Sequence, residues 1–208
     1  MSKNGLTPPL GAALARACTR AGSAVARLRL ERNALGWEGC CRLCAVLEES
    51  GSSGRGGTRL LDLDLSHNAI GGLGASKAIA GLLSRGQLTR LVLTSNPIGK
   101  AEAAAEGAEA AALAAALEGV KLLAAAIAVT KSLRELQLRD AGLEASAGEP
   151  LGAALAENRS LETLSLWKNR LGKAGGAAFV NAMKVSARTD YRLPRRSVPA
   201  LLSDCDEG

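Results

Sequence analysis

A single histidine beside two aspartates is the nearest approach in this sequence to a catalytic or metal-binding group. His67 follows Asp62 and Asp64 in the segment LDLDLSH. Carboxylates and an imidazole are side chains that general acid–base catalysis and metal coordination both use. No cysteine, second histidine or nucleophilic serine in a recognised motif completes the group. We therefore expect three solvated surface residues, and no catalytic residue, metal site or bound cofactor.

Three clustered cysteines raise the same question of a metal site. Cys40, Cys41 and Cys44 lie within five residues, but no histidine is near them in the sequence. The chain has five cysteines, an odd number, without a secretion signal, which argues against a disulfide framework. Free cysteine behaves as a small hydrophobic residue. We interpret Cys40 and Cys44 as packing residues, because the repeats described next place them in the slots that hold Ala75 and Ile79.

A strand-like motif recurs five times and must position every candidate residue. Its cleanest copy, LLDLDLSHNAI, fits the pattern LxxLxLxxNxL. The five copies begin at Val25, Leu60, Leu88, Leu133 and Leu161. The asparagine of the motif falls at Asn33, Asn68, Asn96 and Asn169, and Ala141 replaces it once. The intervals of 35, 28, 45 and 28 residues predict a 28-residue unit with insertions of 7 and 17 residues.

An apolar helix pattern follows each strand motif. A GAxxLAxAL-like pattern begins six residues past the asparagine position, as at Gly39. Its large apolar residues lie four apart, as in Leu43 with Leu47 and Leu123 with Ile127. That spacing places them on one helical face, and the small residues between them allow helix and strand to approach closely. Repeated strand, turn and helix predict an α/β solenoid with a parallel sheet.

These motifs resemble the ribonuclease-inhibitor class of leucine-rich repeats, a type also found in NOD-like receptors, Ran GTPase-activating proteins and tropomodulins. The resemblance covers residues 25–183. It implies a horseshoe-shaped leucine-rich repeat solenoid of about five full repeats, with the parallel sheet on the concave face and the helices on the convex face. It does not imply one function, because a single scaffold serves many unrelated partners.

The repeats divide the chain into three parts. Residues 1–24 contain LGAALA, which recurs at Leu151, and are expected to supply the helix of an incomplete leading repeat that acts as a cap. Residues 25–183 hold the five repeats, with a Gly/Ser-rich insertion near 51–57 and an Ala-rich insertion near 101–118. Residues 184–208 are expected to form an irregular or disordered tail. Either this tail caps the solenoid or the chain is an excerpt of a longer array.

The Ala-rich insertion is expected to be helical, since alanine has the highest helix propensity. It forms either an extra helix or an extension of the regular helix that starts near Gly119, with breaks at Gly107 and Gly119. Leu113, Leu117 and Val120 form an apolar row at helical spacing. Docking of this row on the neighbouring helix is the first interpretation, and partner binding is the alternative.

Composition favours one domain with an aliphatic core. The chain has 208 residues, of which 47% are hydrophobic and only 2% aromatic, so the core must consist of leucine and alanine. Two prolines interrupt the N-terminal segment, which does not read as a signal sequence. The nearest approach to a membrane span, VKLLAAAIAV, has about ten residues, whereas a span needs about 20. We expect a cytoplasmic monomer without a membrane partner, with a nuclear location as the alternative.

The outward positions of the five strands define the expected concave surface. The consensus leucines point into the core, so the third, fifth, seventh and eighth positions of LxxLxLxx face solvent. They are Arg27, Arg29, Glu31, Arg32; Asp62, Asp64, Ser66, His67; Arg90, Val92, Thr94, Ser95; Glu135, Gln137, Arg139, Asp140; and Thr163, Ser165, Trp167, Lys168. Charges alternate down the third column, so neighbouring strands can pair them. Although the net charge of the chain is +6, this surface has six basic and five acidic residues, which argues against nucleic acid as a partner.

Trp167 is the strongest candidate for a partner contact. A large aromatic side chain at an outward strand position gains little from folding, and tryptophan is enriched among interface hot spots. The alternative is that the C-terminal tail folds over Trp167 and buries it. Trp37 precedes a helix and is interpreted as a packing residue. The asparagine column is expected to bond the turn after each strand, and the turn at Ala141 to be looser.

We predict a non-enzymatic scaffold that binds another protein through its concave face. The candidate contacts are Trp167, Lys168, Arg139, Arg27, Arg29, Arg32, Asp62, Asp64, His67 and Arg90. One alternative is a GTPase activator resembling Ran GTPase-activating proteins, which share this repeat type. The other is a structural piece of a larger array of the NOD-like receptor type.

Overall fold

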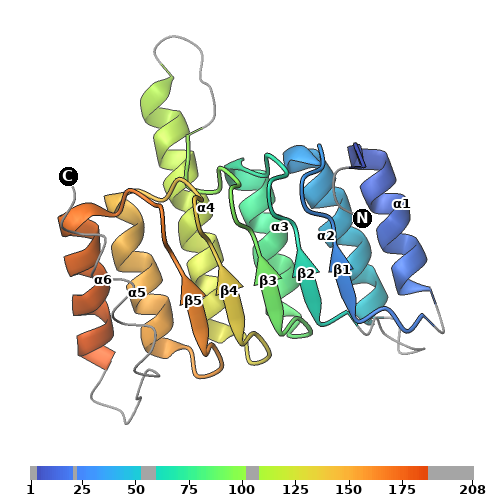
Figure 1. Cartoon of the computed structure of the whole chain (residues 1–208). Helices are drawn as coiled ribbons and strands as arrows, with labels where there is room; N and C mark the ends of the chain where they lie inside the picture. Colours follow the sequence, from blue (N-terminus) through green and yellow to red (C-terminus); the bar gives the residue numbers. More distant parts are fainter. Residues whose placement is uncertain (1–3, 21–22, 53–59, 102–107, 187–208) are drawn as a thin grey trace.

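Strands and helices alternate along the computed structural model, which describes residues 4–20, 23–52, 60–101 and 108–186. The elements in order are α1 (Pro8–Thr19), β1 (Arg27–Arg29), α2 (Gly36–Ser52), β2 (Asp62–Asp64), α3 (Gly72–Ser84), β3 (Arg90–Val92), α4 (Glu109–Val129), β4 (Glu135–Gln137), the 3-10 helix η1 (Ala145–Ala147), α5 (Gly148–Glu157), β5 (Thr163–Ser165) and α6 (Gly172–Ser186). The five strands form one parallel sheet in the order β1-β2-β3-β4-β5 (Figure 1). The predicted leucine-rich repeat solenoid is therefore confirmed.

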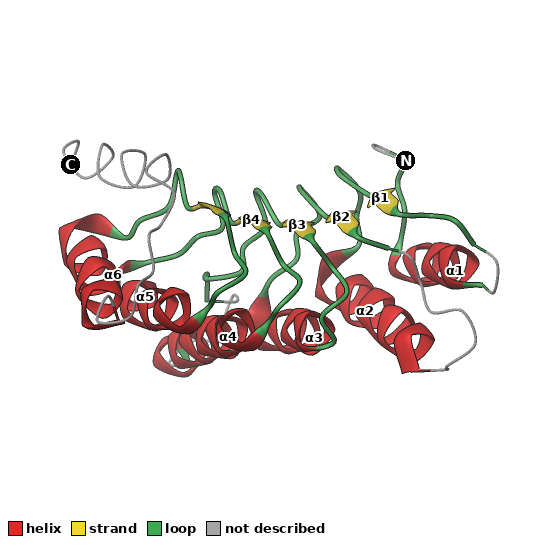
Figure 2. Cartoon of the chain, turned by 90° about the horizontal axis from the view of Figure 1, so that it is seen from below, coloured by secondary structure: helices red, strands yellow, loops and turns green. Residues whose placement is uncertain are grey.

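The two layers of the solenoid follow a shallow arc. Figure 2 shows the strands along the inner side of the arc and the helices along the outer side. Each repeat buries its leucines between its own strand and helix, so one continuous core runs from α1 to α6. The inner surface is thus built by the sheet, as the repeat type implied.

The strand register places equivalent residues side by side. Arg27 pairs with Asp62, Asp62 with Arg90, Arg90 with Glu135, and Glu135 with Thr163. The leucines one position later lie beneath this column, and in the first four strands they are buried. Each fully buried leucine stabilises the fold by about 1.5–3 kcal/mol. The third-position column derived from the motif is the column seen in the sheet.

The asparagine column forms a ladder of side-chain hydrogen bonds between repeats. Asn96 Nδ2 donates to the carbonyl oxygens of Leu65, Leu93 and Thr94. Its Oδ1 accepts from the backbone amides of Asn68 and Ile70, both at 3.0 Å. Asn96 is fully buried, so these bonds replace water for groups that would otherwise be unpaired. The predicted structural role of the column is confirmed.

The ladder is interrupted at Ala141. Asn169 Oδ1 accepts from the backbone amides of Ala141 and Leu143, so the turn at Ala141 is itself held. The missing bonds are those to the preceding repeat, where Ile98 N donates instead to the carbonyl oxygen of Asn96 at 2.8 Å. The looser turn expected at Ala141 stays a prediction.

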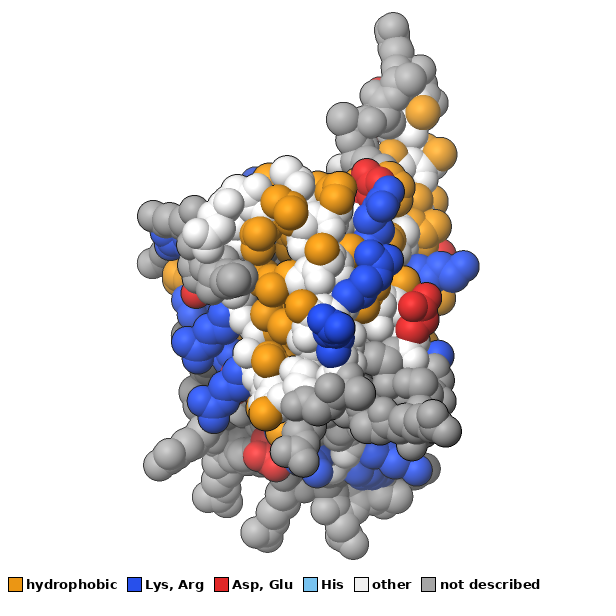
Figure 3. Space-filling model, turned by 90° about the vertical axis from the view of Figure 1, so that its right-hand side faces the viewer, with side chains coloured by type: hydrophobic (Ala, Val, Ile, Leu, Met, Phe, Trp, Pro, Cys, Tyr) orange, Lys and Arg blue, Asp and Glu red, His pale blue; other side chains and the backbone are white. Residues whose placement is uncertain are grey.

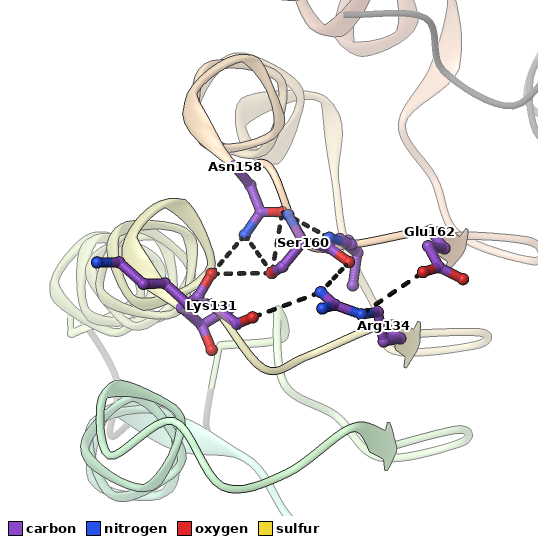
Figure 4. A network of polar contacts seen from close by, with 7 residues as sticks. Lys131, Arg134, Asn158, Ser160 and Glu162 are labelled. Carbon is purple, nitrogen blue, oxygen red and sulfur yellow. Dashed lines mark hydrogen bonds and ion pairs between the residues drawn. The ribbon is translucent and has the colours of Figure 1, made fainter.

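A second polar network joins the ends of α4 and α5, on the opposite edge of the repeats (Figure 4). Asn158 Nδ2 donates to the carbonyl oxygens of Ile127 and Thr130, and its Oδ1 accepts from Ser160 N at 2.8 Å. Ser160 Oγ donates to Thr130 O at 2.9 Å. Arg134 Nη1 donates to Ser160 O at 2.8 Å. These bonds bury the polar groups of the helix-to-strand turns and fix the spacing of β4 and β5.

Helix α4 runs without interruption through Gly119, so the break predicted there is wrong. The reason lies in the neighbouring helix. A Cβ at Gly119 would lie 2.9 Å from the Ser76 hydroxyl oxygen and 3.1 Å from the Ser76 Cβ. Glycine therefore serves close packing between α3 and α4 rather than ending a helix. The break predicted at Gly107 lies outside the described residues.

The N-terminal part of α4 projects from the body of the protein (Figure 1). Helix α4 has 21 residues against 13 in α3, so its first turns lack a neighbouring helix. Val120 is buried and Leu117 is half-buried, but the Leu113 side chain is 50% exposed. The predicted docking of the whole apolar row is therefore wrong at Leu113. The docked part of the row begins at Leu117, where α3 starts to cover α4.

Helix α4 is also the one helix in the described ranges that is long and apolar enough to cross a membrane. The apolar stretch of α4 is longer than the expected stretch of about ten residues, because the helix continues through Gly119 into the Ala-rich insertion. Helices α3 and α5 pack against α4, and 39% of its most apolar 18 residues is buried inside the protein.

Candidate partner-binding surface

The outward positions of the strands fall into three groups along the sheet. The basic end consists of Arg27, Arg29 and Arg32 at β1. The paired centre consists of Asp62, Arg90 and Glu135 on β2, β3 and β4. The aromatic group consists of Ser95, Arg139, Asp140, Trp167 and Lys168, in the turns after β3, β4 and β5. The ten candidate residues therefore do not form one patch, because the sheet spreads them over five strands.

The basic end is exposed and carries no ion pair within the described part of the chain. The β1 arginines, Arg27 and Arg29, lie in register with Asp62 and Asp64. Those two carboxylates are engaged elsewhere, Asp62 by Arg90 and Asp64 by Ser66. Arg32 in the following turn is also exposed. The three arginines thus form a basic group at one end of the sheet, with the acidic Glu31 between Arg29 and Arg32.

The paired centre holds one guanidinium between two carboxylates. Arg90 Nη1 lies 3.0 Å from Asp62 Oδ1, and Arg90 Nε lies 3.0 Å from Glu135 Oε2. Burial alone would lower the pKa of the Arg90 guanidinium, but the two carboxylates raise that pKa above its ordinary value. The guanidinium stays charged and its fork is occupied by two neighbouring strands. A partner would have to break this network to contact Arg90 fully.

The two aspartates near His67 are engaged separately, Asp62 by Arg90 and Asp64 by Ser66. Asp64 Oδ1 accepts from Ser66 N at 3.0 Å and from Ser66 Oγ at 2.6 Å, which closes a local turn. His67 is exposed after that turn. The described residues contain no group of three or more His, Cys, Asp or Glu side chains that could hold a metal ion.

The clustered cysteines are packing residues of α2. Cys40 and Cys44 are fully buried, with their sulfur atoms 4.0 Å apart. The neighbouring Cys40 thiol and burial raise the pKa of Cys44 well above its ordinary value, so it stays protonated at neutral pH. A buried, protonated thiol is a poor nucleophile and a poor metal ligand.

The aromatic group is held together by contacts from three repeats. The guanidinium carbon of Arg139 lies 4.7 Å from the ring centroid of Trp167. Asp140 Oδ2 accepts from Ser95 Oγ at 3.0 Å and from Lys168 Nζ at 3.2 Å. The Ser95 hydroxyl, followed by Lys168, lowers the pKa of the Asp140 carboxyl, so this group is ionised throughout the neutral range. The cluster presents an aromatic ring, two cations and one carboxylate in a fixed arrangement.

Trp167 is 52% exposed in this arrangement. A cation over an exposed ring contributes about 0.5–1 kcal/mol, which orders the side chains but leaves much of the ring in water. The alternative of a tail folded over Trp167 concerns residues 187–208, which lie outside the described residues. Trp37 was interpreted as a packing residue, but its side chain is 57% exposed. Only part of its ring packs, against Gly74 on α3.

The eighth position of every copy adopts a left-handed backbone conformation, which the motif alone did not reveal. The φ angles are 56° at Arg32, 55° at His67, 53° at Ser95, 51° at Asp140 and 61° at Lys168. Such angles are uncommon for residues other than glycine, and β-branched residues avoid them most. The absence of valine, isoleucine and threonine from this column was the signal available in the sequence.

Comparisons with known proteins agree with the observed fold. A family model described as Leucine Rich repeat matches residues 58–77 and 157–180. The mouse protein named NACHT, LRR and PYD domains-containing protein 12 is 28% identical over 176 residues, which is 84% of this chain and 14% of the mouse protein. The chain thus spans about one seventh of the length of that curated relative.

A solved structure shares the arrangement of strands and helices. It is described as Leiomodin-1 Actin-Binding Site 2, and it superposes with a TM-score of 0.56. The match covers 86% of this chain and 88% of the leiomodin chain at 17% sequence identity. At this identity the similarity extends to the fold alone.

Proposed function

We propose that this chain, a leucine-rich repeat protein of the NOD-like receptor type, is a non-enzymatic scaffold that binds a partner protein through its concave surface. Leucine-rich repeat domains are generally non-catalytic interaction modules. The similar fold of leiomodin-1, whose structure is described as an actin-binding site, supports protein as the class of partner. The observation that carries the proposal is the exposed, preformed contact of Trp167 with Arg139.

The aromatic group has the composition of an interface hot spot. Tryptophan and arginine are the residues most enriched where a few side chains supply most of the binding energy. The Trp167 ring is exposed, yet Arg139 already restricts its motion, so less side-chain entropy is lost when a partner covers it. Lys168 and Asp140 add charges of both signs at its rim, which favour a partner with matching polar groups.

The remaining candidates contribute less to this contact. Asp62 and Arg90 are committed to the paired centre, and Asp64 is committed to its own turn. His67 is exposed between the basic end and the aromatic group, where it can form the rim of an interface. We assign the central contact to the aromatic group and a peripheral role to the other positions.

A reducing location is part of the proposal. Cys18, Cys40, Cys41 and Cys44 are free thiols. Unpaired cysteines are typical of proteins of the cytosol and nucleus, where disulfides are rare. We propose the cytoplasm as the location, with the nucleus as the alternative.

The test compares two exposed tryptophans. Immobilised wild-type chain, Trp167→Ala and Trp37→Ala are incubated with the same cell lysate, and bound proteins are quantified by mass spectrometry. Trp37 is the matched control because it has a similar exposed fraction but lies at the start of α2, outside the concave surface. A specific partner is expected to bind the wild type and Trp37→Ala equally. Loss of a hot-spot tryptophan costs about 2 kcal/mol or more, so recovery by Trp167→Ala should fall at least about tenfold.

The affinity of the purified partner for each variant completes this test. Equal affinity for the wild type and Trp167→Ala would remove the aromatic group from the interface. A GTP hydrolysis assay with small GTPases addresses the enzymatic alternative, for which the proposal expects no acceleration.

A further inference from the structure

Exposed apolar side chains at the end of a repeat stack do not identify a partner. Figure 3 views the end formed by α1 and shows hydrophobic side chains gathered at its centre, with Lys and Arg side chains along its sides. Such a face suits a further repeat as well as a partner, because each repeat buries its neighbour. Residues on an interior strand are free of this ambiguity, since the repeats on both sides of them are present.

Arg139 follows the interior strand β4, which lies between the described strands β3 and β5. Ser95 N donates to Arg139 O at 2.8 Å, and Asp140 N donates to Trp167 O at 3.0 Å. These bonds continue the ladder past the ends of the three strands. In the register of the sheet, Arg139 therefore lies between Thr94 and Trp167.

The guanidinium of Arg139 has no carboxylate partner in the described part of the chain. Its carbon lies over the Trp167 ring, and no ion pair or side-chain hydrogen bond from the described residues engages its N–H groups. Arg90, one strand away, lies between Asp62 and Glu135 and pairs with both. The same sheet thus gives one arginine two carboxylates, and the other a hydroxyl and an indole.

Asp140, the residue after Arg139, is engaged by other groups. Its Oδ2 accepts from Ser95 Oγ at 3.0 Å and from Lys168 Nζ at 3.2 Å. The Ser95 hydroxyl, Lys168 and the charge of Lys100 together lower the pKa of this carboxyl. Arg139, Lys168 and Lys100 thus bring three positive charges to the neighbourhood of the Asp140 carboxylate. This local excess favours an anionic group on the partner.

The arrangement of Arg139 and Trp167 selects the kind of anion. A guanidinium presents its N–H donors in a planar fork that matches the two oxygens of a carboxylate. The ring holds the Arg139 guanidinium in place, so less side-chain entropy is lost when a carboxylate binds. The Trp167 side chain is 52% exposed and offers an apolar surface beside the fork. The complementary segment therefore carries a carboxylate and an apolar side chain close together.

We propose that the aromatic group binds a partner segment in which Asp or Glu lies beside a large apolar residue. The carboxylate accepts hydrogen bonds from Arg139, and the apolar side chain covers the Trp167 ring. This inference rests on the proposed function, which makes the aromatic group the central contact, and it adds the chemistry of the partner. A nucleic-acid strand would bring a row of phosphates past the Asp140 carboxylate, which favours a protein segment instead.

The first experiment selects peptides from a random-sequence phage library on the immobilised full chain. Each selected peptide is then tested against Trp167→Ala, and those that lose binding are the ligands of the aromatic group. We expect Asp or Glu beside an apolar residue to be enriched among them over the unselected library. Replacing that Asp or Glu by Asn or Gln should weaken binding to the wild type at least about tenfold, because a charged hydrogen-bonded pair is lost.

A double-mutant cycle assigns the carboxylate to Arg139. The acidic peptide and its amide counterpart are titrated by fluorescence anisotropy into the wild type, Arg139→Gln and Arg85→Gln. Arg139→Gln should bind both peptides equally, because the partner of the carboxylate is lost. Arg85→Gln is the matched control, because Arg85 is exposed but lies at the C-terminal end of α3, outside the concave surface. It should retain the preference of the wild type for the acidic peptide.

The outcomes distinguish this inference from the proposed function. Trp167-dependent peptides that lack an acidic residue, or a preference for the acidic peptide that survives in Arg139→Gln, would overturn the inference and leave the proposed function standing. The absence of any Trp167-dependent peptide would contradict both. Displacement of the acidic peptide by oligothymidylate in the same anisotropy assay would assign the surface to nucleic acid and also overturn the inference.

Discussion

Two buried asparagines of the same column should differ sharply in what their removal costs. Asn96 and Asn68 are both fully buried and one repeat apart. Asn96→Ala deprives the amides of Asn68 and Ile70 of the oxygen that they bond. The side-chain oxygen of Asn68, by contrast, has no hydrogen-bond partner within the described residues. Asn68→Ala therefore leaves no amide unpaired.

The carbonyl oxygens that accept from the Asn68 side chain also keep a partner when that side chain is removed. Those that lose Asn68 Nδ2 each keep another donor: Leu30 O keeps Asn33 Nδ2, Leu65 O keeps Asn96 Nδ2, and Ser66 O keeps Arg32 N. A buried, unsatisfied group costs about 1–3 kcal/mol. Two orphaned amides make Asn96→Ala cost about 2–6 kcal/mol of unfolding free energy. Asn68→Ala loses only secondary bonds and should cost about 1–2 kcal/mol.

Urea unfolding followed by far-UV circular dichroism measures both costs, and equal m-values are required for the comparison. We expect the free energy of unfolding of Asn96→Ala to lie about 2 kcal/mol below that of Asn68→Ala. Asn169→Ala is the control for burial. It removes the same kind of bonds to Ala141 and Leu143, but Asn169 is half-buried, so water can replace them. Equal costs for Asn96→Ala and Asn68→Ala would refute the assignment of stability to the two amide donors.

Three further predictions concern packing, ionisation and the projecting helix. Gly119→Ala should lower the free energy of unfolding by about 1–3 kcal/mol in urea, because the added Cβ meets the Ser76 side chain, and Ser76→Gly should restore it. Ser95→Ala should raise the pKa of the Asp140 carboxyl, measured by NMR titration, because the hydroxyl that stabilises the ionised form is lost. Since that pKa is lowered in the folded protein, its stabilising contribution is present above about pH 3.9 and is lost as the pH falls through the lowered value. Leu113→Ser should change the free energy of unfolding in urea by no more than about 0.5 kcal/mol, because this side chain is exposed on the projecting part of α4.

The sequence predicted the sheet because its pattern is local and repeated. Leucines at alternate positions and an asparagine at a fixed distance determine which side chains face inward and how adjacent strands align. Trp167 and Arg139 were both expected to face outward at the seventh position, and both do so. Their stacking could not be predicted, because it depends on the rotamers of two residues 28 positions apart in sequence.

Features set by neighbouring helices were beyond the sequence pattern. Gly119 looked like a helix break, yet its role depends on Ser76 in the adjacent helix. Leu113 shares the helical spacing of Val120, but only Val120 lies where α3 covers α4. Periodicity identifies a helical face without telling whether a neighbour reaches it. Tertiary contacts decided both cases.

The left-handed turns have a consequence for the thermodynamics of association. At Lys168 and the four equivalent positions the backbone is already held at a positive φ by the turn that follows each strand. Fixing the backbone of one residue costs about 1–2 kcal/mol in entropy. At these positions the backbone is already ordered in the folded protein, so binding does not add this cost. A partner that contacts this column needs to order only side chains. Calorimetry of such a complex should therefore show a small conformational-entropy penalty from the backbone of these five positions.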